Sequence, residues 1–588
     1  MAFLRNWLLS TLIISCLGMG NLHAQDVFVS PNYHSAAIQV SNPSAWDTDT
    51  NGYCKILYRK RGTLEWMHSI SPDRIHFDGI TDFRVSLFGL EENTQYSVKA
   101  SLHDSLPSPD SIIVSEFSFT TKTNPSFKTQ GKTYWVNAAG QYSDYTKSKP
   151  GDLKTLLRSG LACGTTVIVM DDTYQIGDLT LNLTSSCTES DPIIIKADQG
   201  AKPLFIGSTQ NKVTWTQSPS DTFLYSATLP SDASYTNLML VNGKRMYPYS
   251  TLGNNIFLGN YNLSSLNFGF DGFCRDASSI YFKSSSGINP NKENVVLSNQ
   301  FRALTVQGNG NEVYLRIKGI HFLHYAKSKV DLSAAYNAQT LVFRNCHKVV
   351  VDSCEFLFND NPIVFYGGCS DVTVQHCNFK DNVGDWSHAM IKKSFANQTA
   401  IYPTSRGRSL ENSSIAYHYG ASNSTSIVYR YNTIQGSGDG IAFKAGPKGI
   451  YNVDFYENTV RRCFDGVEFD GLFSNLKVWK NVVDSNVASI SIAPPRFGPS
   501  YFYRNEVKNI ISRQNTSDDT YFVRCVPPVE YISQGVGIKT NVGGLTTDGA
   551  VLHFINNTFH SRDTNAFVQY LWASEWNAIH FVTISSTE

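Results

Sequence analysis

The chain has 588 residues, of which 41% are hydrophobic and 17% are charged, and it carries 49 Lys and Arg against 49 Asp and Glu. This length exceeds that of one ordinary compact domain, and the composition is that of a folded protein. A formal net charge of zero argues against a general nucleic-acid binder, because such proteins need an excess of basic residues.

Residues 1–24 have the form of a secretory signal peptide. One arginine, Arg5, precedes an apolar run from Trp7 to about Met19, and the small-residue sequence LHA ends at Ala24. The run is short for a membrane span and no later segment is apolar enough to cross a bilayer, so we expect no transmembrane segment. We expect a protein that is secreted or held at the cell surface or in the periplasm. The sequence IISC, ending at Cys16, also resembles a lipoprotein box, which leaves a lipid anchor as the alternative.

Residues 26–122 predict a small β-sandwich, because several segments alternate apolar and polar residues between Gly, Pro and Asn: SAAIQVS, YCKILYRK and FRVSLFGL. Leu90 then lies six residues before Tyr96, ahead of another alternating strand. This spacing resembles the tyrosine corner of fibronectin type III domains, in which a buried tyrosine hydroxyl bonds nearby backbone. We expect this module to be a spacer or a binding unit.

A short helix is predicted after the linker at 121–127, because leucines recur there at helical spacing: Leu153, Leu156, Leu157 and Leu161. The strand TTVIVM follows it. One amphipathic helix followed by a stack of strands is the expected way to cap the open end of a β-solenoid. Cys163 and Cys187 flank this segment and could pair in an oxidising compartment.

The region from about residue 320 repeats with a period in the low twenties. Cys346 and Cys369 are 23 residues apart, as are Cys354 and Cys377. Turn asparagines recur at one or two such steps: Asn378, Asn432, Asn458, Asn481, Asn505 and Asn557. This period is typical of a parallel β-helix, in which three strands form a coil and coils stack about 4.8 Å apart.

Stacked coils bring like residues together. We therefore expect the four cysteines to form two ladders of buried thiols, with one or two disulfides as an alternative. A four-cysteine zinc site is disfavoured because the usual CxxC spacing is absent. We expect the turn asparagines to form a hydrogen-bonded ladder.

With these repeats the chain resembles the right-handed parallel β-helix proteins of the pectin-lyase-like superfamily. The segments that carry the resemblance are GTTVIVMDDTY, the asparagine turns, GDGIAFK and FGPSYFYRN. The resemblance covers about residues 130–588 and implies an all-β chain, a fibronectin type III-like sandwich followed by a right-handed parallel β-helix. An irregular insert at 205–300 and an inserted loop at 386–420 interrupt the rhythm. Lyases, hydrolases, epimerases and adhesins share this scaffold, so the fold alone does not set the activity.

One face of the predicted β-helix gathers charged residues. Strands begin seven residues past the turn asparagines, at Asp439, Asp465 and Ala488, and alternation then places two outward columns: His388, Glu468 and Ser491 in one, Lys444 and Asp470 in the next. Aspartate before glycine is often only a turn former. Stacked carboxylates repel unless a cation or a shared proton relieves them, and calcium suits an all-oxygen site. Resemblance to calcium-dependent pectate lyases implies four calcium ligands: Asp439, Asp465, Glu468 and Asp470.

The inserted loop mixes basic and aromatic residues, which suit an acidic polysaccharide because cations meet its acid groups and aromatic rings stack on its sugars. The candidate substrate-binding residues are Lys392, Tyr402, Arg408, Tyr417, His418 and Tyr419. A solvated loop is the alternative interpretation.

We expect a polysaccharide lyase that cleaves a uronic-acid-containing polymer by β-elimination. The candidate base is Lys444 or His388, and Arg406 would steer the substrate. Nearby carboxylates would resist deprotonation of Lys444, which counts against it. One alternative is a glycoside hydrolase that uses Asp439 and Asp465 as carboxylates about 5 Å apart. Another is a non-catalytic glycan-binding adhesin. The sequence indicates no oligomeric state.

Overall fold

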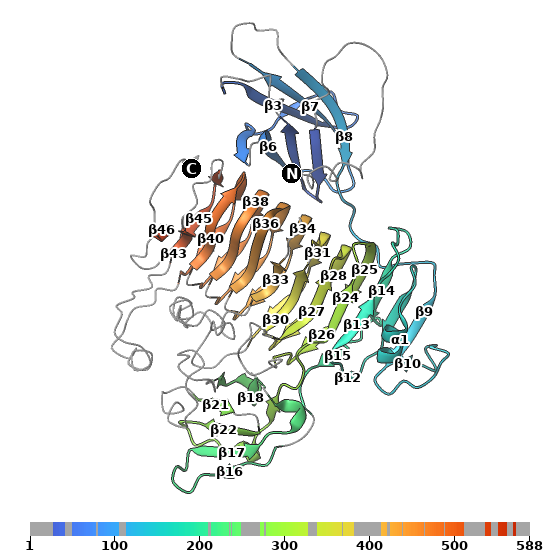
Figure 1. Cartoon of the computed structure of the whole chain (residues 1–588), viewed down its shortest axis with the longest axis vertical. Helices are drawn as coiled ribbons and strands as arrows, with labels where there is room; N and C mark the ends of the chain where they lie inside the picture. Colours follow the sequence, from blue (N-terminus) through green and yellow to red (C-terminus); the bar gives the residue numbers. More distant parts are fainter. Residues whose placement is uncertain are drawn as a thin grey trace, which may run out of the picture.

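The computed structural model describes residues 27–571 with gaps, of which the longer are 42–49, 105–112, 249–270, 327–337, 382–412, 511–535, 542–550 and 561–567. The expected signal peptide and Cys16 lie outside the described residues. Figure 1 shows a β-sandwich, a long stack of parallel strands and a smaller β-rich insertion beside the stack. Among the described residues, no helix has the length and apolar character needed to cross a membrane.

The N-terminal module is a sandwich of two antiparallel four-stranded sheets, as predicted for 26–122. One sheet contains β1 (Val27–Pro31), β2 (Ser35–Ser41), β6 (Ile80–Phe88) and β5 (Asp73–Phe77). The other contains β4 (Met67–His68), β3 (Tyr53–Lys60), β7 (Gln95–His103) and β8 (Ile113–Thr120). Tyr96 is buried, and its hydroxyl accepts a hydrogen bond from the backbone N–H of Glu91 at 2.9 Å. The contact expected of a tyrosine corner is therefore present, while the fibronectin type III assignment stays a prediction.

The rest of the described chain winds into a right-handed parallel β-helix. Each full coil supplies one strand to each of three sheets, here called sheets 1, 2 and 3 in the order in which the chain visits them. Long strands such as β36 and β38 run through the turn from sheet 1 into sheet 2.

Sheet 1 consists of β13 (Leu179–Asn182), β24 (Leu304–Gln307), β27 (Gln339–Arg344), β30 (Asn361–Tyr366), β33 (Ser413–Tyr419), the first parts of β36 (Asp439–Tyr456) and β38 (Asp465–Trp479), β40 (Ala488–Phe497), β43 (Val536–Asn541) and β46 (Val568–Leu571). Sheet 2 consists of β9 (Thr133–Asn137), β11 (Thr166–Val169), β14 (Ile193–Ala197), β25 (Glu312–Lys318), β28 (His347–Asp352), β31 (Ser370–Gln375), β34 (Ser424–Arg430), the second parts of β36 and β38, β41 (Ser500–Tyr503) and β44 (Leu552–Ile555). Sheet 3 consists of β12 (Thr173–Gln175), β15 (Leu204–Ile206), β26 (His321–Leu323), β29 (Glu355–Leu357), β32 (Asn378–Lys380), β35 (Thr433–Gln435), β37 (Thr459–Arg461), β39 (Val482–Asp484), β42 (Glu506–Lys508) and β45 (Thr558–His560).

The first coil is closed by a cap, as the sequence predicts. Helix α1 (Leu153–Ser159) follows β10 (Gly151–Asp152) and buries Leu153, Leu156 and Leu157 against the interior. Its first turn is fixed by Asp152, whose side chain accepts a hydrogen bond from the N–H of Thr155 at 2.6 Å. Cys163 and Cys187 form a disulfide.

The interior is filled by columns of like residues. The rings of Phe322, Phe356 and Phe379 stack with centroids 5.0 and 4.9 Å apart. The predicted cysteine ladders are confirmed: the N–H of Cys346 donates to the sulfur of Cys369 at 3.4 Å, and Cys354 and Cys377 lie on successive coils. All four are buried free thiols, so the disulfide alternative is wrong for these residues. Burial raises the pKa of Cys377 above its ordinary value, which keeps this thiol protonated.

The turn from sheet 2 to sheet 3 carries the predicted asparagine ladder. The backbone N–H groups of Asn432, Asn458, Asn481 and Asn505 each donate to the side-chain oxygen of the next asparagine, at 2.9–3.1 Å. The last acceptor in this series is Asn557. Each buried amide is thus satisfied only when its coil is in register with the next.

The predicted ladder position of Asn378 is wrong by one residue. Asn378 pairs with Thr433, so Cys377 occupies the ladder position and its N–H donates to the side chain of Asn432 at 2.9 Å. The amide of Asn378 instead donates to Glu355 at 3.0 Å. A cysteine ladder and an asparagine ladder therefore form one continuous column, which sequence spacing alone read as two.

The longest connections in the described β-helix lie at one corner, where the chain passes from sheet 3 to the next strand of sheet 1. We call this the insertion corner. Between β15 and β24 it carries an insertion with its own core, built from β16 (Thr216–Gln217), β17 (Leu224–Thr228), β18 (Met239–Val241), β19 (Lys244–Arg245), β20 (Tyr247–Pro248), β21 (Gly272–Arg275), β22 (Ser279–Lys283) and β23 (Val295–Leu297). The described part of the expected irregular insert at 205–300 thus contains short β-strands and a core of its own. The expected inserted loop at 386–420 overlaps β33, so residues 413–419 belong to sheet 1.

Arg245 fastens the insertion to the corner. Its guanidinium is 2% exposed, donates to Asp360 at 3.0 Å and also bonds Asp381. Both carboxylates stand at the insertion corner of neighbouring coils, directly before β30 and directly after β32. Although burial opposes it, the two carboxylates raise the pKa of Arg245, so this contact is a buried ion pair.

The sandwich packs against sheet 2 of the later coils through buried polar groups (Figure 1). Asp454 accepts hydrogen bonds from Asn32 at 2.5 Å and Ser35 at 2.6 Å in the sandwich, and from Trp479 at 3.2 Å in the β-helix. The ammonium of Lys477 lies 3.5 Å from the same carboxylate, and both residues are at most 1% exposed. Burial lowers the pKa of Lys477 even though Asp454 opposes the shift. The two domains therefore share one polar core.

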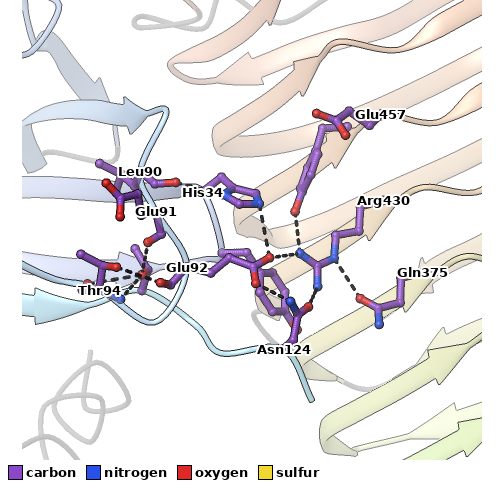
Figure 2. A network of polar contacts seen from close by, with 12 residues as sticks. His34, Leu90, Glu91, Glu92, Thr94, Asn124, Gln375, Arg430 and Glu457 are labelled. Carbon is purple, nitrogen blue, oxygen red and sulfur yellow. Dashed lines mark hydrogen bonds and ion pairs between the residues drawn. The ribbon is translucent and has the colours of Figure 1, made fainter. Parts of the chain in front are cut away.

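Figure 2 shows a second part of this interface, centred on Arg430 of β34. Its guanidinium donates to Glu92 of the sandwich at 2.7 Å, to Asn124 of the linker, and to Gln375 at 2.9 Å and Tyr456 at 3.0 Å in the β-helix. Arg430 is 1% exposed, so these bonds lie in a desolvated environment where geometry is strongly specified.

The ladder register predicts that an asparagine on the ladder contributes more to stability than one beside it. Asn481→Ala removes an acceptor for Asn458 and a donor to the carbonyl of Phe455, and we expect it to lower the free energy of unfolding by about 3 kcal/mol. The measurement is urea unfolding of the full chain. Asn378→Ala is the matched control: it lies one position off the ladder and should cost less than about 1 kcal/mol. Equal losses in the two variants would contradict the assigned register.

Candidate functional site

Three buried carboxylates meet where sheet 1 leaves the insertion corner. Asp439 and Asp465 are the first residues of β36 and β38 and are direct partners across the two strands. Glu468 follows three residues after Asp465. One carboxylate oxygen from each residue lies within 4.8 Å of the other two, and the residues are 1%, 0% and 3% exposed. We call Asp439, Asp465 and Glu468 the acidic cluster.

The glycines that follow the two aspartates let the coils approach closely. A Cβ atom on Gly440 would stand 2.3 Å from the carbonyl oxygen of Gly466, and one on Gly466 would stand 2.7 Å from that of Ser489. Both contacts are far inside van der Waals distance, so only glycine fits. The Asp-Gly pairs therefore do more than form turns, since they hold two carboxylates at successive levels of one tightly packed corner.

The acidic cluster is electrostatically unfavourable as three bare charges. At 4.8 Å two full charges repel by roughly 3.5 kcal/mol at an effective dielectric constant of about 20, and burial adds a desolvation cost. A cation, bound protons or neighbouring polar groups can offset this repulsion. The donor set fits Ca²⁺, which is a hard cation that binds carboxylate and other oxygen ligands.

Two serine hydroxyls extend the cluster on the next coil. Ser491 is the strand partner of Glu468, and Ser489 lies at the level below Gly466. Both are 0% exposed, and within the part of the chain that the structure describes their hydroxyl oxygens have no hydrogen-bond partner. A buried hydroxyl without a partner is costly. Ser491 is therefore a candidate oxygen ligand beside Glu468.

Cys463 lies at the insertion corner two residues before Asp465, but its thiol adds no ligand to the acidic cluster. Burial chiefly, with added contributions from the carboxylates of Asp439 and Asp465, raises the pKa of its thiol to about 12. The thiol therefore stays protonated, and its N–H is held by the side chain of Asn486 at 2.7 Å. Its role is to shape the corner.

The predicted register of the acidic face is confirmed for β36, β38 and β40. It is wrong for the segment that was expected to begin at residue 385, because the strand that pairs with the start of β36 is β33, with Ser413 opposite Asp439, so His388 does not hold the column position predicted for it. Ile441, Phe443, Val467, Phe469, Ile490 and Ile492 all lie in the core of the β-helix. Asp439 pairs with Asp465 and then Ala488, Glu468 pairs with Ser491, and Lys444 pairs with Asp470. The side chains of Lys444 and Asp470 lie outside the described residues, so their roles as base and calcium ligand stay predictions.

The other expected site residues lie in the inserted loop that was expected at 386–420. His388, Lys392, Tyr402, Arg406 and Arg408 lie outside the described residues. Three more lie on β33, where His418 pairs with Phe365 and Tyr419 with Tyr366, but nothing is described of the side chains of Tyr417, His418 and Tyr419. Of the four expected calcium ligands, the structure thus brings three together and leaves the fourth at a register position.

Sequence reasoning missed one charged residue at a register position of this face. Lys539 of β43 is the strand partner of Ser491, which places it two coils after Glu468 in the same outward column. The signal was the alternating segment VGIKTN (536–541), but a connection of 27 residues between β42 and β43 hid its place in the repeat.

Within the described residues, the acidic cluster is the group of His, Cys, Asp and Glu side chains that could hold a metal ion.

No protein-family model and no curated protein sequence matches the chain. Solved structures do match, at low similarity. They include the pectate lyase Pel9A, with a TM-score of 0.34 and 10% identity over 76% of this chain and 82% of that one.

A family 28 exopolygalacturonase from Yersinia enterocolitica matches with a TM-score of 0.29 and 12% identity, over 95% of this chain and 97% of the other. An alginate lyase from Paenibacillus sp. str. FPU-7 matches with a TM-score of 0.28 and 11% identity, over 74% and 97%. Likeness at this level of identity does not assign an activity to the chain.

The acidic cluster predicts that calcium stabilises the fold. Calcium at about one hundred times its dissociation constant should add about 2.7 kcal/mol and raise the melting temperature relative to protein in chelator. Asp465→Asn should abolish most of this rise, because a neutral amide is a weaker ligand for a hard cation. Ser491→Ala should reduce it less.

The matched control is Asp484→Asn on sheet 3, where the carboxylate pairs with Arg461 and not with the cluster. It should leave the calcium-dependent rise intact. A melting temperature that calcium does not change in the unaltered protein would contradict the cation site.

Proposed function

We propose that the protein is a secreted polysaccharide lyase that cleaves a uronic-acid-containing polymer by β-elimination. The observation that supports this proposal best is the acidic cluster. One carboxylate oxygen from each of its three residues lies within 4.8 Å of the other two, whereas a glycoside hydrolase needs only a pair of carboxyl groups. Three mutually close, buried carboxylates suit a cation site better than an acid–base pair.

In this proposal Asp439, Asp465 and Glu468 hold calcium, with Asp470 and the hydroxyl of Ser491 as further oxygen ligands. Bound calcium would neutralise the carboxylate of a uronate and so favour negative charge at the carbon from which a proton is removed. The chain's own contribution is to fix the carboxylates on two adjacent strands, so that the sugar acid group is presented to one face of sheet 1.

A base must then accept the proton next to the sugar carboxylate. We propose Lys444, whose strand position adjoins the cluster on β36, with Lys539 on β43 and His388 as alternatives. A lysine beside bare carboxylates holds its proton, and neutralising the carboxylates relieves that hold. Arg406 would steer the polymer, and Arg408, Lys392, Tyr402, Tyr417, His418 and Tyr419 would bind acid groups and sugar rings along it.

The decisive experiment incubates the full chain with a panel of uronate-containing polymers, with calcium or with chelator. We expect an unsaturated product, detected by its ultraviolet absorbance, that appears with calcium and not with chelator. Lys444→Met should lower the rate about 100-fold or more if Lys444 is the base. Lys480→Met, at an exposed lysine paired with Glu457 at 3.3 Å, is the matched control.

Other products would support other functions. New reducing ends without unsaturation, unaffected by chelator and lost in Asp439→Asn, would indicate a hydrolase in which the directly paired Asp439 and Asp465 act as the two carboxylates. Binding of the polymer without any product would indicate an adhesin. Either result would overturn the lyase proposal.

A further inference from the structure

A cavity of about 700 Å³ lies between the β-helix and the segment that joins it to the sandwich. Its floor is sheet 2 at three successive coils, and its walls are the linker, the loop at 188–190 and Tyr33 of the sandwich. The volume is in the range of roughly 300–1,000 Å³ that is typical of small-molecule sites. The cavity opens on sheet 2, whereas the acidic cluster belongs to sheet 1.

Two lysines in this cavity share one carboxylate. The ammonium of Lys122 lies 3.1 Å from Asp371, and that of Lys348 lies 3.0 Å from the other oxygen of the same carboxylate. Arg316 also lines the cavity and pairs with Glu189, so it adds no net charge. The residues that line the cavity therefore carry three positive and two negative charges, and Glu312 and Asp454 act on the two lysines from outside it.

The three charges are not equally well compensated. Burial alone would raise the pKa of Asp371, but the two ammonium groups outweigh it and hold this pKa well below its ordinary value. Asp371 also outweighs the burial of Lys348 and raises its pKa. Burial dominates at Lys122, whose pKa is lowered in spite of Asp371. Lys122 is thus the cation that a further anion would stabilise most.

An aromatic ring stands beside these charges. Tyr314 lines the cavity at a β-bulge, where two residues of β25 oppose one residue of β28. Its side chain is half-buried, and the ammonium of Lys348 lies 5.9 Å from the ring centroid. Tyr33 forms the opposite wall, with its hydroxyl bonded to Thr373 at 3.1 Å.

Three residues that line the cavity belong to a column on sheet 2 whose later members contact the sandwich. The column consists of one positive-φ residue from each coil: Tyr314, Lys348, Asp371, Ser426, Asn452 and Asn475. The last three are small and bond the sandwich directly, through Asn32, Ser30 and Ser86. The first three are long or charged and line the cavity. The sandwich therefore contacts three of these six positions, and the other three line the cavity.

We propose that this cavity is a second glycan-binding site, which takes a sugar bearing an acid group, with the acid group against the ammonium groups of Lys122 and Lys348 and the sugar ring against Tyr314. A carboxylate or a sulfate would pair with these ammonium groups, and the ring would supply a stacking surface. This site is independent of the proposed lyase chemistry, because none of its residues belongs to the acidic cluster.

The test measures binding of short oligosaccharides to the full chain by calorimetry, in the Asp465→Asn background so that no substrate is consumed. Four probes are compared: a uronate oligosaccharide, a sulfated oligosaccharide, a neutral oligosaccharide of equal length, and inorganic sulfate. We expect one or both acidic oligosaccharides to bind and the neutral one to bind at least about tenfold more weakly. Lys348→Ala should weaken binding of the acidic probe about tenfold or more, and Tyr314→Ala should weaken it severalfold.

Lys318→Ala is the matched control, because Lys318 lies on the same strand β25 but pairs with Asp352 at 3.6 Å and does not line the cavity. It should bind as the parent does. Lys348→Arg keeps the charge and should retain most of the affinity, and melting curves of each variant show whether it is folded. If Lys348→Ala does not fold, Tyr314→Ala decides the question.

Three results would overturn the proposal. The first is no binding of either acidic oligosaccharide, and the second is binding that Lys348→Ala and Tyr314→Ala leave unchanged. The third is equal affinity for inorganic sulfate and for the acidic sugars, which would indicate a simple anion site. Loss of cleavage in Asp465→Asn with binding retained would separate this site from the proposed active site.

Discussion

The register between successive coils is the constraint on which the rest of the molecule depends. It is enforced where the chain turns from sheet 2 to sheet 3, because the asparagines from Asn432 to Asn557 bond the neighbouring coils through their side chains. Once the register is fixed, residues at equal positions in the repeat must stack. The benzene rings and thiols of the interior stack favourably, and the same rule forces Asp439 onto Asp465. The acidic cluster is thus a local electrostatic cost that the repetitive packing holds in place.

Much of the β-helix could be predicted from the spacing of repeated residues. The cysteines and asparagines recur with the period of the coil, and apolar and polar residues alternate around Ile441 and Val467. The same spacing placed three of the four expected calcium ligands together. It failed where the repeat changes residue type or length. Cys377 stands in for an asparagine, so Asn378 was assigned to the wrong column, and a long connection hid the strand position of Lys539. A period reports which residues are equivalent only when the loops between them keep the same length.

The docking of the sandwich could not be predicted from the sequence, because nothing local marks a residue as an interface residue. Asp454, Lys477 and Arg430 read as ordinary outward charges on alternating strands, yet all three are buried under the first domain. Their desolvation is tolerable because each charge has several polar partners. The insertion corner differs from the asparagine turn. Its connections vary greatly in length, while the strands on either side remain in register. Connection length therefore varies at the corner that borders the acidic cluster, and it stays nearly constant at the turn that carries the asparagine ladder.

The contact between the sandwich and the later coils has a consequence for how the polypeptide reaches its native state. Asn32 bonds Asp454 across 422 residues, and Asp73 bonds His553 across 480. The domain that leaves the ribosome first therefore receives its partner surface almost last, after most coils have been made. Until then, Asn32, Ser35 and Arg84 face water instead of their final partners. Contacts this distant in sequence close slowly, so docking of the two domains is a late event that follows the growth of the solenoid.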